Sequence, residues 1–147
     1  MKNIILCLVL LTSGALFNGA VLAEDTSGVQ LFDHKAMDEA FSKGKMLITN
    51  NHYKVLAGRR VEPGVVEVHE HDTDVIYVTE GNATFVIGGS IADAKTDSPG
   101  EIRAKISTGG TAHHLNKGDV IVVPKGIPHW FSEVSGTFLY FVVKVTE

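Results

Sequence analysis

The chain has 147 residues, with 13 basic and 17 acidic side chains and a formal net charge of −4. Its basic residues are scattered singly or in pairs, without the stripe that binds phosphates, so nucleic acid is not expected as a partner. The only cysteine, Cys7, lies in an N-terminal leader, so we expect no disulfide in the mature protein. The remaining length suits one domain around a single hydrophobic core.

Residues 1–23 have the pattern of a secretory signal peptide. Lys2 is followed by an apolar run from Ile4 to Leu11, and small residues then lead to the predicted cleavage site after Ala23. A membrane anchor is the alternative, but the apolar run is too short to span a bilayer. We therefore predict a periplasmic or secreted protein that is not attached to the membrane after cleavage.

A short helix is predicted near the start of the mature chain. Asp33 suits the N-cap position, and Gly44 suits the C-terminal end. Between them, Ala36, Ala40 and Phe41 share one face of a helix. We expect this face to pack against the domain rather than to carry function.

From Met46 onward the sequence consists of short runs rich in β-branched and aromatic residues, separated by Gly, Pro, Asn and Asp. Seven or eight strands at this spacing indicate an all-β sandwich or barrel. Because no internal repeat or linker divides them, residues 24–147 are predicted to form a single domain. The runs lie at residues 46–49, 53–57, 65–71, 75–79, 83–87, 101–106, 119–123 and 137–145.

Three histidines form a candidate metal site. His69 and His71 are two residues apart in a strand-like run, and such side chains point to the same face. His129 follows a Pro-x-Gly turn, Pro124 to Gly126, and could supply a third imidazole. Three neutral imidazoles that meet in this way form a transition-metal site with room for water or a substrate.

Both histidine segments resemble the two sequence motifs of the cupin superfamily. The second motif is a glycine, five residues, Pro-x-Gly, two residues, a histidine, three residues and an asparagine. Residues 118–133 match it, with Glu133 in the asparagine position. Residues 64–81 resemble the first motif. The resemblance extends over residues 53–145 and implies a double-stranded β-helix, which is a jelly-roll barrel with its site in the mouth.

The first motif departs from the family pattern at its acidic position. The family's glutamate has no equivalent at the usual distance from the second histidine, and Asp74 is the substitute because it keeps the spacing to Gly81. The resemblance therefore implies His69, His71 and His129 as metal ligands, with Asp74 as a fourth. The alternative role for Asp74 is to orient a ligand imidazole by accepting a hydrogen bond from its other ring nitrogen.

Three further residues are candidates for catalysis. Glu67 shares strand parity with His69, so it is predicted to face the interior, where burial raises the pKa of an unpaired carboxylate and suits acid–base chemistry. Glu133 is in the same parity as His129 and could face the same interior. His114 precedes the second motif and could contact a substrate. The alternative for each is a solvent-exposed position.

The ligand types suit one divalent transition metal per chain, with Fe, Mn, Zn, Ni and Cu all allowed. The metal would act as a Lewis acid or activate dioxygen on a small oxygen-rich or anionic molecule. The resemblance implies a metal-dependent enzyme, and we favour dioxygenase or lyase chemistry over isomerase chemistry. The alternative is a non-catalytic cupin that binds a small ligand or a metal ion. The run at residues 137–145 is hydrophobic on both faces, so a homodimer is expected.

Overall fold

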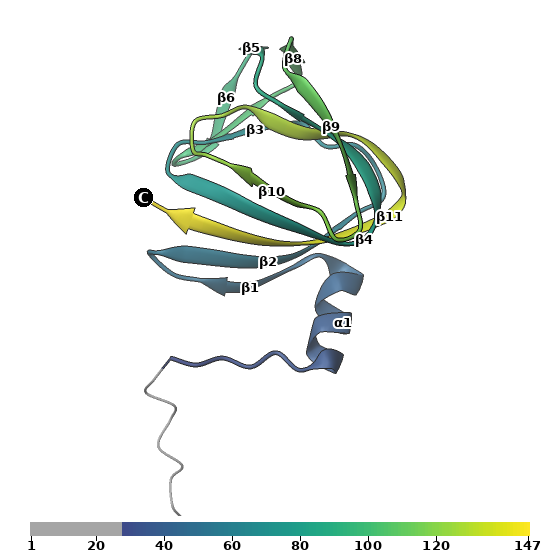
Figure 1. Cartoon of the computed structure of the whole chain (residues 1–147). Helices are drawn as coiled ribbons and strands as arrows, with labels where there is room; N and C mark the ends of the chain where they lie inside the picture. Colours follow the sequence, from purple (N-terminus) through teal and green to yellow (C-terminus); the bar gives the residue numbers. More distant parts are fainter. Residues whose placement is uncertain (1–27) are drawn as a thin grey trace, which may run out of the picture. The chain divides into compact units, whose positions relative to one another are not determined.

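The computed structural model describes residues 28–147, and Phe32–Glu147 form one unit within them. The predicted signal peptide lies outside the described residues. A short helix, α1 (His34–Lys43), is followed in the described chain by strands (Figure 1). Their bounds are β1 (Lys45–Thr49), β2 (Tyr53–Arg60), β3 (Val66–His69), β4 (Asp72–Ile87), β5 (Ser90–Ala92), β6 (Lys95–Ser98), β7 (Glu101–Ala104), β8 (Ile106–Thr108), β9 (Thr111–Asn116), β10 (Val120–Val123) and β11 (His129–Thr146).

The helix α1 begins and ends where the sequence predicts. The Asp33 side chain caps it by accepting a hydrogen bond from the Ala36 amide at 2.8 Å. Gly44 ends it with a φ of 65°, which residues with a side chain rarely adopt. Its buried residue is Ala40, on the predicted packing face. No helix of the described residues is long and apolar enough to cross a membrane.

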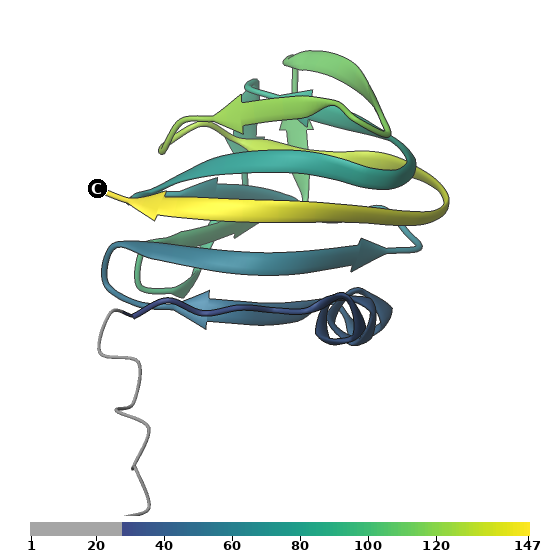
Figure 2. The same ribbon diagram turned by 60° about the horizontal axis from the view of Figure 1, so that its bottom comes forward.

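The two long strands, β4 and β11, organise the fold. They run antiparallel along their whole lengths, in pairs that extend from His129 and Ile87 at one end to Thr146 at the other. β11 also pairs with β2 and, at His129, with β3, while β4 also pairs with β10 and β9. The sheet therefore curls around one interior (Figures 1 and 2). This arrangement confirms the predicted all-β jelly-roll barrel with a short N-terminal helix.

Two runs that the sequence separates are joined in β4. The runs at residues 75–79 and 83–87 are continuous through Gly81, which has a φ of 78°. A side chain at Gly81 would collide with the carbonyl oxygen of Thr137. Glycine therefore lets the strand bend without ending it.

The core lies inside the curled sheet and is rich in aromatic residues. The Phe131 ring is central, with its centroid 4.6 Å from that of Phe85, 5.3 Å from that of Phe138 and 5.0 Å from that of Tyr140. Burying each of these apolar side chains stabilises the fold by roughly 1.5–3 kcal/mol. Phe85, Phe131 and Tyr140 also line a cavity that has charged residues in its lining, so the core supplies the apolar wall of that cavity.

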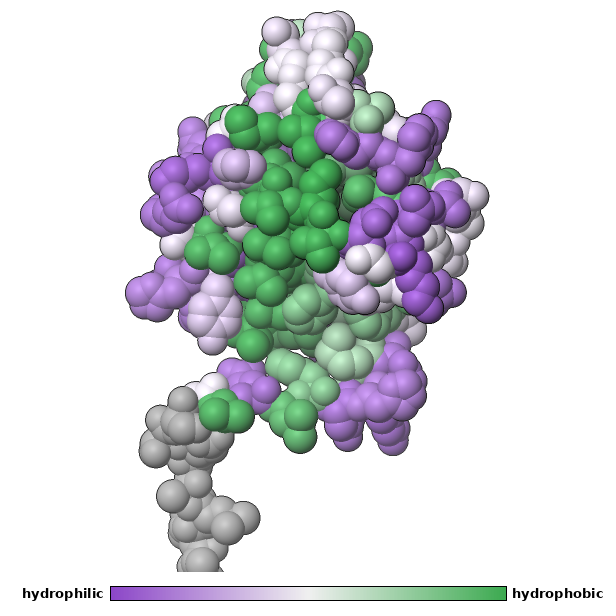
Figure 3. Space-filling view, viewed as in Figure 1, coloured by the Kyte–Doolittle hydropathy of each residue, from purple (hydrophilic) through white to green (hydrophobic). Residues whose placement is uncertain are grey.

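One outer face of the sheet exposes hydrophobic side chains. Tyr77 of β4 lies opposite Val120 of β10, and both are exposed, as is Val122. Figure 3 shows a hydrophobic band across the face of the molecule that it presents. Scattered exposed apolar residues are normal, whereas these side chains lie close together on neighbouring strands.

Candidate metal centre

The site is built on β3, where Glu67 and His69 are two residues apart and point to the same face. His69 is only 2% exposed, and Glu67 is half-buried. In the sheet, Glu67 lies opposite His129 of β11, and His69 lies opposite Glu101 of β7. Strand pairing therefore brings His129 beside Glu67, although 62 positions separate them in the printed sequence.

The Pro-x-Gly turn of the second motif positions His129. Gly126 has a φ of 80°, and its amide donates a hydrogen bond to the carbonyl oxygen of His69 at 2.7 Å. This bond ties the turn to the end of β3. β11 begins directly afterwards at His129, whose side chain is buried. The backbone of the turn thus fixes one histidine relative to the other.

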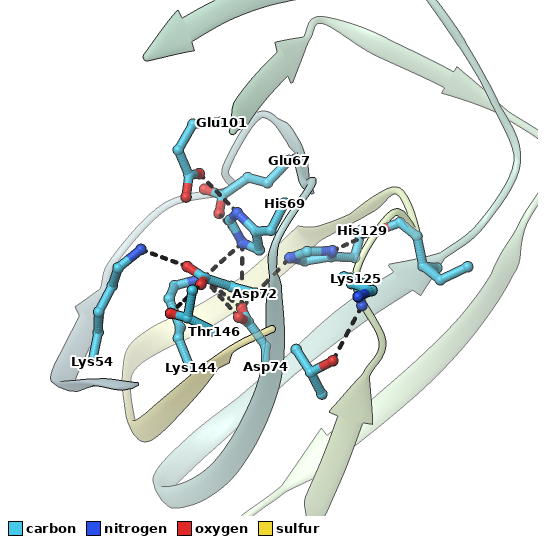
Figure 4. Close-up of polar contacts among 12 residues, drawn as sticks. Lys54, Glu67, His69, Asp72, Asp74, Glu101, Lys125, His129, Lys144 and Thr146 are labelled. Atoms are coloured by element: carbon cyan, nitrogen blue, oxygen red, sulfur yellow. Dashed lines mark hydrogen bonds and ion pairs between the residues drawn. The ribbon is translucent and has the colours of Figure 1, made fainter. Parts of the chain in front are cut away.

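The donor atoms of Glu67, His69 and His129 lie within 4.8 Å of one another. His69 Nδ1 is 2.7 Å from Glu101 Oε2, and His129 Nδ1 is 2.8 Å from the carbonyl oxygen of Ile127. Because a carbonyl only accepts, His129 Nδ1 carries the hydrogen and its Nε2 has a free lone pair. Glu67 Oε2 lies 3.7 Å from His69 Nε2. One carboxylate and two anchored imidazoles therefore meet at one point (Figure 4).

Lys144 and Asp74 complete the cluster. They are partners across the β4–β11 pair, and Lys144 Nζ donates hydrogen bonds to Asp74 Oδ1 at 2.7 Å and to Asp74 Oδ2 at 2.8 Å. Lys144 Nζ also lies 2.7 Å from His69 Nε2. These contacts use all three ammonium hydrogens. Asp74 Oδ2 is 3.4 Å from His69 Nε2 and 3.8 Å from His129 Nε2, so Asp74 is close to both imidazoles while paired with the lysine.

The residues present fit a divalent transition metal in their chemistry. Two imidazoles and a carboxylate form a common ligand set for such ions. The hydrogen bonds from the Nδ1 atoms to Glu101 and to the Ile127 carbonyl are the outer contacts that orient ligand imidazoles. One feature opposes a metal, because Lys144 already occupies the lone pair of His69 Nε2.

Burial and neighbouring charges shift three pKa values in the cluster. Burial alone would lower the pKa of His69, but the adjacent carboxylates of Asp74 and Glu101 raise it above 6.5 despite the charge of Lys144. Burial would raise the pKa of Asp74, but His69 and Lys144 hold it below 3.8. For His129 burial prevails and lowers the pKa, so its imidazole is neutral at pH 7.

A cavity of about 340 Å³ opens at the cluster. Its polar lining includes Arg60 and Arg103 beside Glu67 and Glu101. Arg103 Nη1 is buried and lies 3.4 Å from Glu67 Oε2 and from Glu101 Oε2, yet it makes no hydrogen bond of good geometry. Arg60 Nε donates to the Tyr140 hydroxyl at 3.1 Å. The cavity therefore combines the candidate ligands with guanidinium groups.

Residues 49–147 match the family model described as Cupin. The chain belongs to the cupin family. A comparison with curated proteins found no match.

Solved structures with TM-scores above 0.5 show the same fold. A Klebsiella pneumoniae protein with a double-stranded β-helix domain has a TM-score of 0.57 at 15% identity, covering 82% of this chain and 88% of its own. A Bacillus halodurans protein has a TM-score of 0.55 at 16% identity, covering 82% of this chain and 84% of its own. Peruvianin-I, a cysteine peptidase from Thevetia peruviana latex, has a TM-score of 0.45 at 10% identity, covering 65% of this chain. The cupin spans 51% of that longer protein's chain.

The structure does not bring His71 into the cluster. β3 ends at His69, and the chain bends at Glu70, whose amide donates to the Gly100 carbonyl oxygen at 2.8 Å. The alternation of side chains therefore ends at His69, two residues before His71, and His71 is exposed. The metal-ligand role predicted for His71 has no support in this geometry.

Glu133 and His114 lie together on the outer face of the barrel. β11 shifts register between Phe131 and Glu133, so Glu133 pairs with Thr84 rather than facing the interior. Such a bulge reverses the side-chain parity beyond it. Thr84 Oγ1 donates to Glu133 Oε2 at 2.7 Å and lies 3.2 Å from His114 Nδ1. Both predicted catalytic residues are therefore exposed and outside the cavity lining.

Glu67 faces the interior, as parity predicts, but it contacts cations and joins the candidate ligand set. The sequence reasoning missed Lys144, Glu101 and Arg103. A lone lysine in an apolar terminal strand, with the same parity as Tyr140, was the available signal for Lys144. Glu101 and Arg103 share parity in one strand, but only the pairing of β7 with β3 places them at the site.

Proposed function

We propose that this cupin holds one divalent transition metal at Glu67, His69 and His129 and binds a small oxygen-rich or anionic molecule beside it. The observation that carries the proposal is the convergence of three donor atoms within 4.8 Å at a cavity, with both imidazoles anchored through Nδ1. The neutral form of His129 leaves its Nε2 available for coordination.

A metal bound at this site would supply Lewis-acid chemistry or dioxygen activation. Three protein ligands leave coordination positions open for a small molecule. Arg103 supplies a buried N–H group without a hydrogen-bond acceptor, and a guanidinium binds carboxylate and other oxyanions well. Phe85 and Ile76 give the same cavity an apolar wall that limits water. These features support a small anion as the ligand.

Dioxygenase or lyase chemistry remains our favoured activity. The alternative, a non-catalytic binder of a small ligand or metal, has one observation in its favour. Each carboxylate that lines the cavity already contacts a cationic group: Glu67 contacts Arg60 and Arg103, Glu101 contacts Arg103, and Asp74 contacts Lys144. A paired carboxylate is a weak general base at neutral pH. Oxygen uptake with catechols, flavonoids, thiols and small keto acids separates an oxygenase from the other possibilities.

The metal content of the purified protein tests whether Glu67, His69 and His129 hold an ion. Purified protein incubated with Mn²⁺ or Zn²⁺ and then desalted should retain about one ion per chain, since the site has one set of converging donors. His129→Ala and Glu67→Gln should lose this ion. His71→Ala is the matched control, because it removes a nearby histidine that lies outside the cluster, and it should retain the ion. Equal metal content in His129→Ala and wild type would refute the centre.

Export and dimerisation are further parts of the proposal. Export is supported by the signal-peptide pattern of residues 1–23, and intact-mass measurement of the exported protein should show cleavage after Ala23.

A homodimer is supported by the exposed apolar side chains of Tyr77, Val120 and Val122. Val120→Lys with Val122→Lys should convert a dimer to a monomer in light scattering, whereas a wild-type monomer would contradict it.

A further inference from the structure

We propose that the Lys144 ammonium takes the place of the metal in the metal-free protein, so that Lys144 must leave before an ion binds and thereby sets the metal affinity. This inference rests on the proposed metal centre and concerns the control of that same site. Lys144 approaches from β11, between the two strands that carry Asp74 and Lys54 (Figure 4).

Lys144 and a metal ion compete for the same lone pair, that of His69 Nε2. His69 Nδ1 is directed to Glu101 Oε2 at 2.7 Å, so His69 has only Nε2 to offer a metal. Lys144 Nζ lies 2.7 Å from that same Nε2, and because an ammonium group can only donate, the Nε2 lone pair is the acceptor of this contact. A nitrogen lone pair cannot accept this hydrogen bond and coordinate an ion at once. Metal binding at His69 and the present position of Lys144 are therefore mutually exclusive.

The positive charge of Lys144 also opposes a metal ion at this position. The side chains of Lys144, Asp74 and His69 are 13%, 5% and 3% exposed, so water screens them little. The ammonium compensates the Asp74 carboxylate through two short hydrogen bonds. A divalent ion at the same point would meet this positive charge at close range. The flexible stem of lysine and the adjoining cavity allow the ammonium to move away.

The departure of Lys144 would free two ligand groups together. His69 Nε2 regains its lone pair, and Asp74 loses its short ion pair. Asp74 Oδ2 already lies 3.4 Å from His69 Nε2 and 3.8 Å from His129 Nε2, near where an ion bound to both imidazoles would lie. Lys144 therefore controls whether Asp74 can join Glu67 as a second carboxylate ligand.

The test compares Lys144→Met with Lys54→Met in calorimetric titrations with Zn²⁺ and, separately, Mn²⁺. Lys54 lines the same cavity and lies opposite Lys144 in the β2–β11 pair, but its ammonium bonds to Asp72 Oδ2 at 2.6 Å. Both variants lose one positive charge, and only Lys144→Met frees His69. If the Lys144 ammonium is away from His69 in about one wild-type molecule in ten, only that fraction can bind the ion. Lys144→Met should then lower the dissociation constant for the metal about tenfold. Lys54→Met should stay close to wild type.

A second pair of variants guards against misfolding, because Lys144→Met leaves Asp74 buried without its partner. Asp74→Asn combined with Lys144→Met removes the ion pair as a unit and should bind Zn²⁺ more tightly than Asp74→Asn alone, which keeps the lysine on His69. His129→Ala supplies the background from other histidines.

The outcomes separate this inference from the proposed function. Equal affinities of wild type and the Lys144 variants would overturn the competition and leave the metal centre standing. Binding by the Lys144 variants alone would support the competition and contradict the proposed metal centre in the wild-type protein. If no variant binds more Zn²⁺ or Mn²⁺ than His129→Ala, both proposals fail.

Discussion

Two clusters of histidine and glutamate lie on opposite sides of the barrel wall, and they differ in what surrounds them. The inner cluster of Glu67, His69 and His129 is largely buried and lies at the cavity. The outer cluster, in which Thr84 contacts Glu133 and His114, is exposed. The inner imidazoles are buried and held by fixed partners. In the outer cluster, solvent competes for each contact.

Side-chain type and spacing alone do not assign chemistry to these clusters. Glu133 follows His129 by four residues, which in a regular strand places both on one face. One register shift in β11 moves Glu133 to the other face. Water then reduces the energy of its interactions to the level of ordinary surface contacts. Variants of the buried cluster should therefore have larger effects than matched variants of the exposed cluster.

Asp74→Ala should have the largest effect on stability. It leaves the Lys144 ammonium without its carboxylate in a nearly buried position, and such a loss costs about 3–5 kcal/mol of unfolding free energy. Glu133→Ala, the matched change in the outer cluster, should cost about 0.5 kcal/mol or less. Urea denaturation of both variants measures the contrast. Similar losses for the two would remove the distinction between buried and exposed clusters.

Glu101→Ala should weaken metal binding without removing a ligand. Glu101 holds His69 through Nδ1, and loss of such an outer partner lowers metal affinity about 10–100-fold. His114→Ala removes an imidazole from the outer cluster and should leave the Zn²⁺ affinity unchanged. If His114→Ala weakens binding as much as Glu101→Ala, then the outer cluster contributes to the metal site.

Asp72→Asn should change how stability depends on acidity. Burial would raise the pKa of Asp72, but hydrogen bonds from Lys54 and Thr146 and the charge of Lys54 lower it below 3.8. A depressed pKa adds stability above the unfolded-state value of about 3.9, and this stability disappears as pH falls through the lower folded-state pKa. The variant should lose about 1–3 kcal/mol at pH 7.

Denaturation between pH 6 and pH 2 checks this prediction. The wild-type advantage over Asp72→Asn should persist down to about pH 4 and then shrink as Asp72 becomes protonated. An advantage that stays constant over the whole range would show that ionisation of Asp72 is not its source.

The sequence was sufficient for the fold and for part of the site. Alternating apolar runs, the Pro-x-Gly turn and the helix caps are local signals, and the structure confirms the barrel, the turn and α1. Parity also placed Glu67 and His69 on the interior face correctly. These features depend on neighbours along the chain, which a single sequence displays.

The remaining features depend on where strands end and which strands pair. His71 falls outside the cluster because β3 stops at His69, and Glu133 is turned outward by a bulge that no glycine or proline marks. Lys144 reaches His69 across strands 75 positions apart in the chain. Without knowledge of which strands pair, a single sequence does not show that these two residues are in contact. The position of the Lys144 ammonium at the centre of the site is therefore known only from the structure.

Anomalous diffraction from a crystal soaked in Zn²⁺ tests the central claim most directly. We predict one strong anomalous peak within coordination distance of Glu67, His69 Nε2 and His129 Nε2, with the Lys144 ammonium moved away from His69. A zinc peak only at surface residues such as His114, with Lys144 still bonded to His69 Nε2, would contradict a metal centre in this barrel.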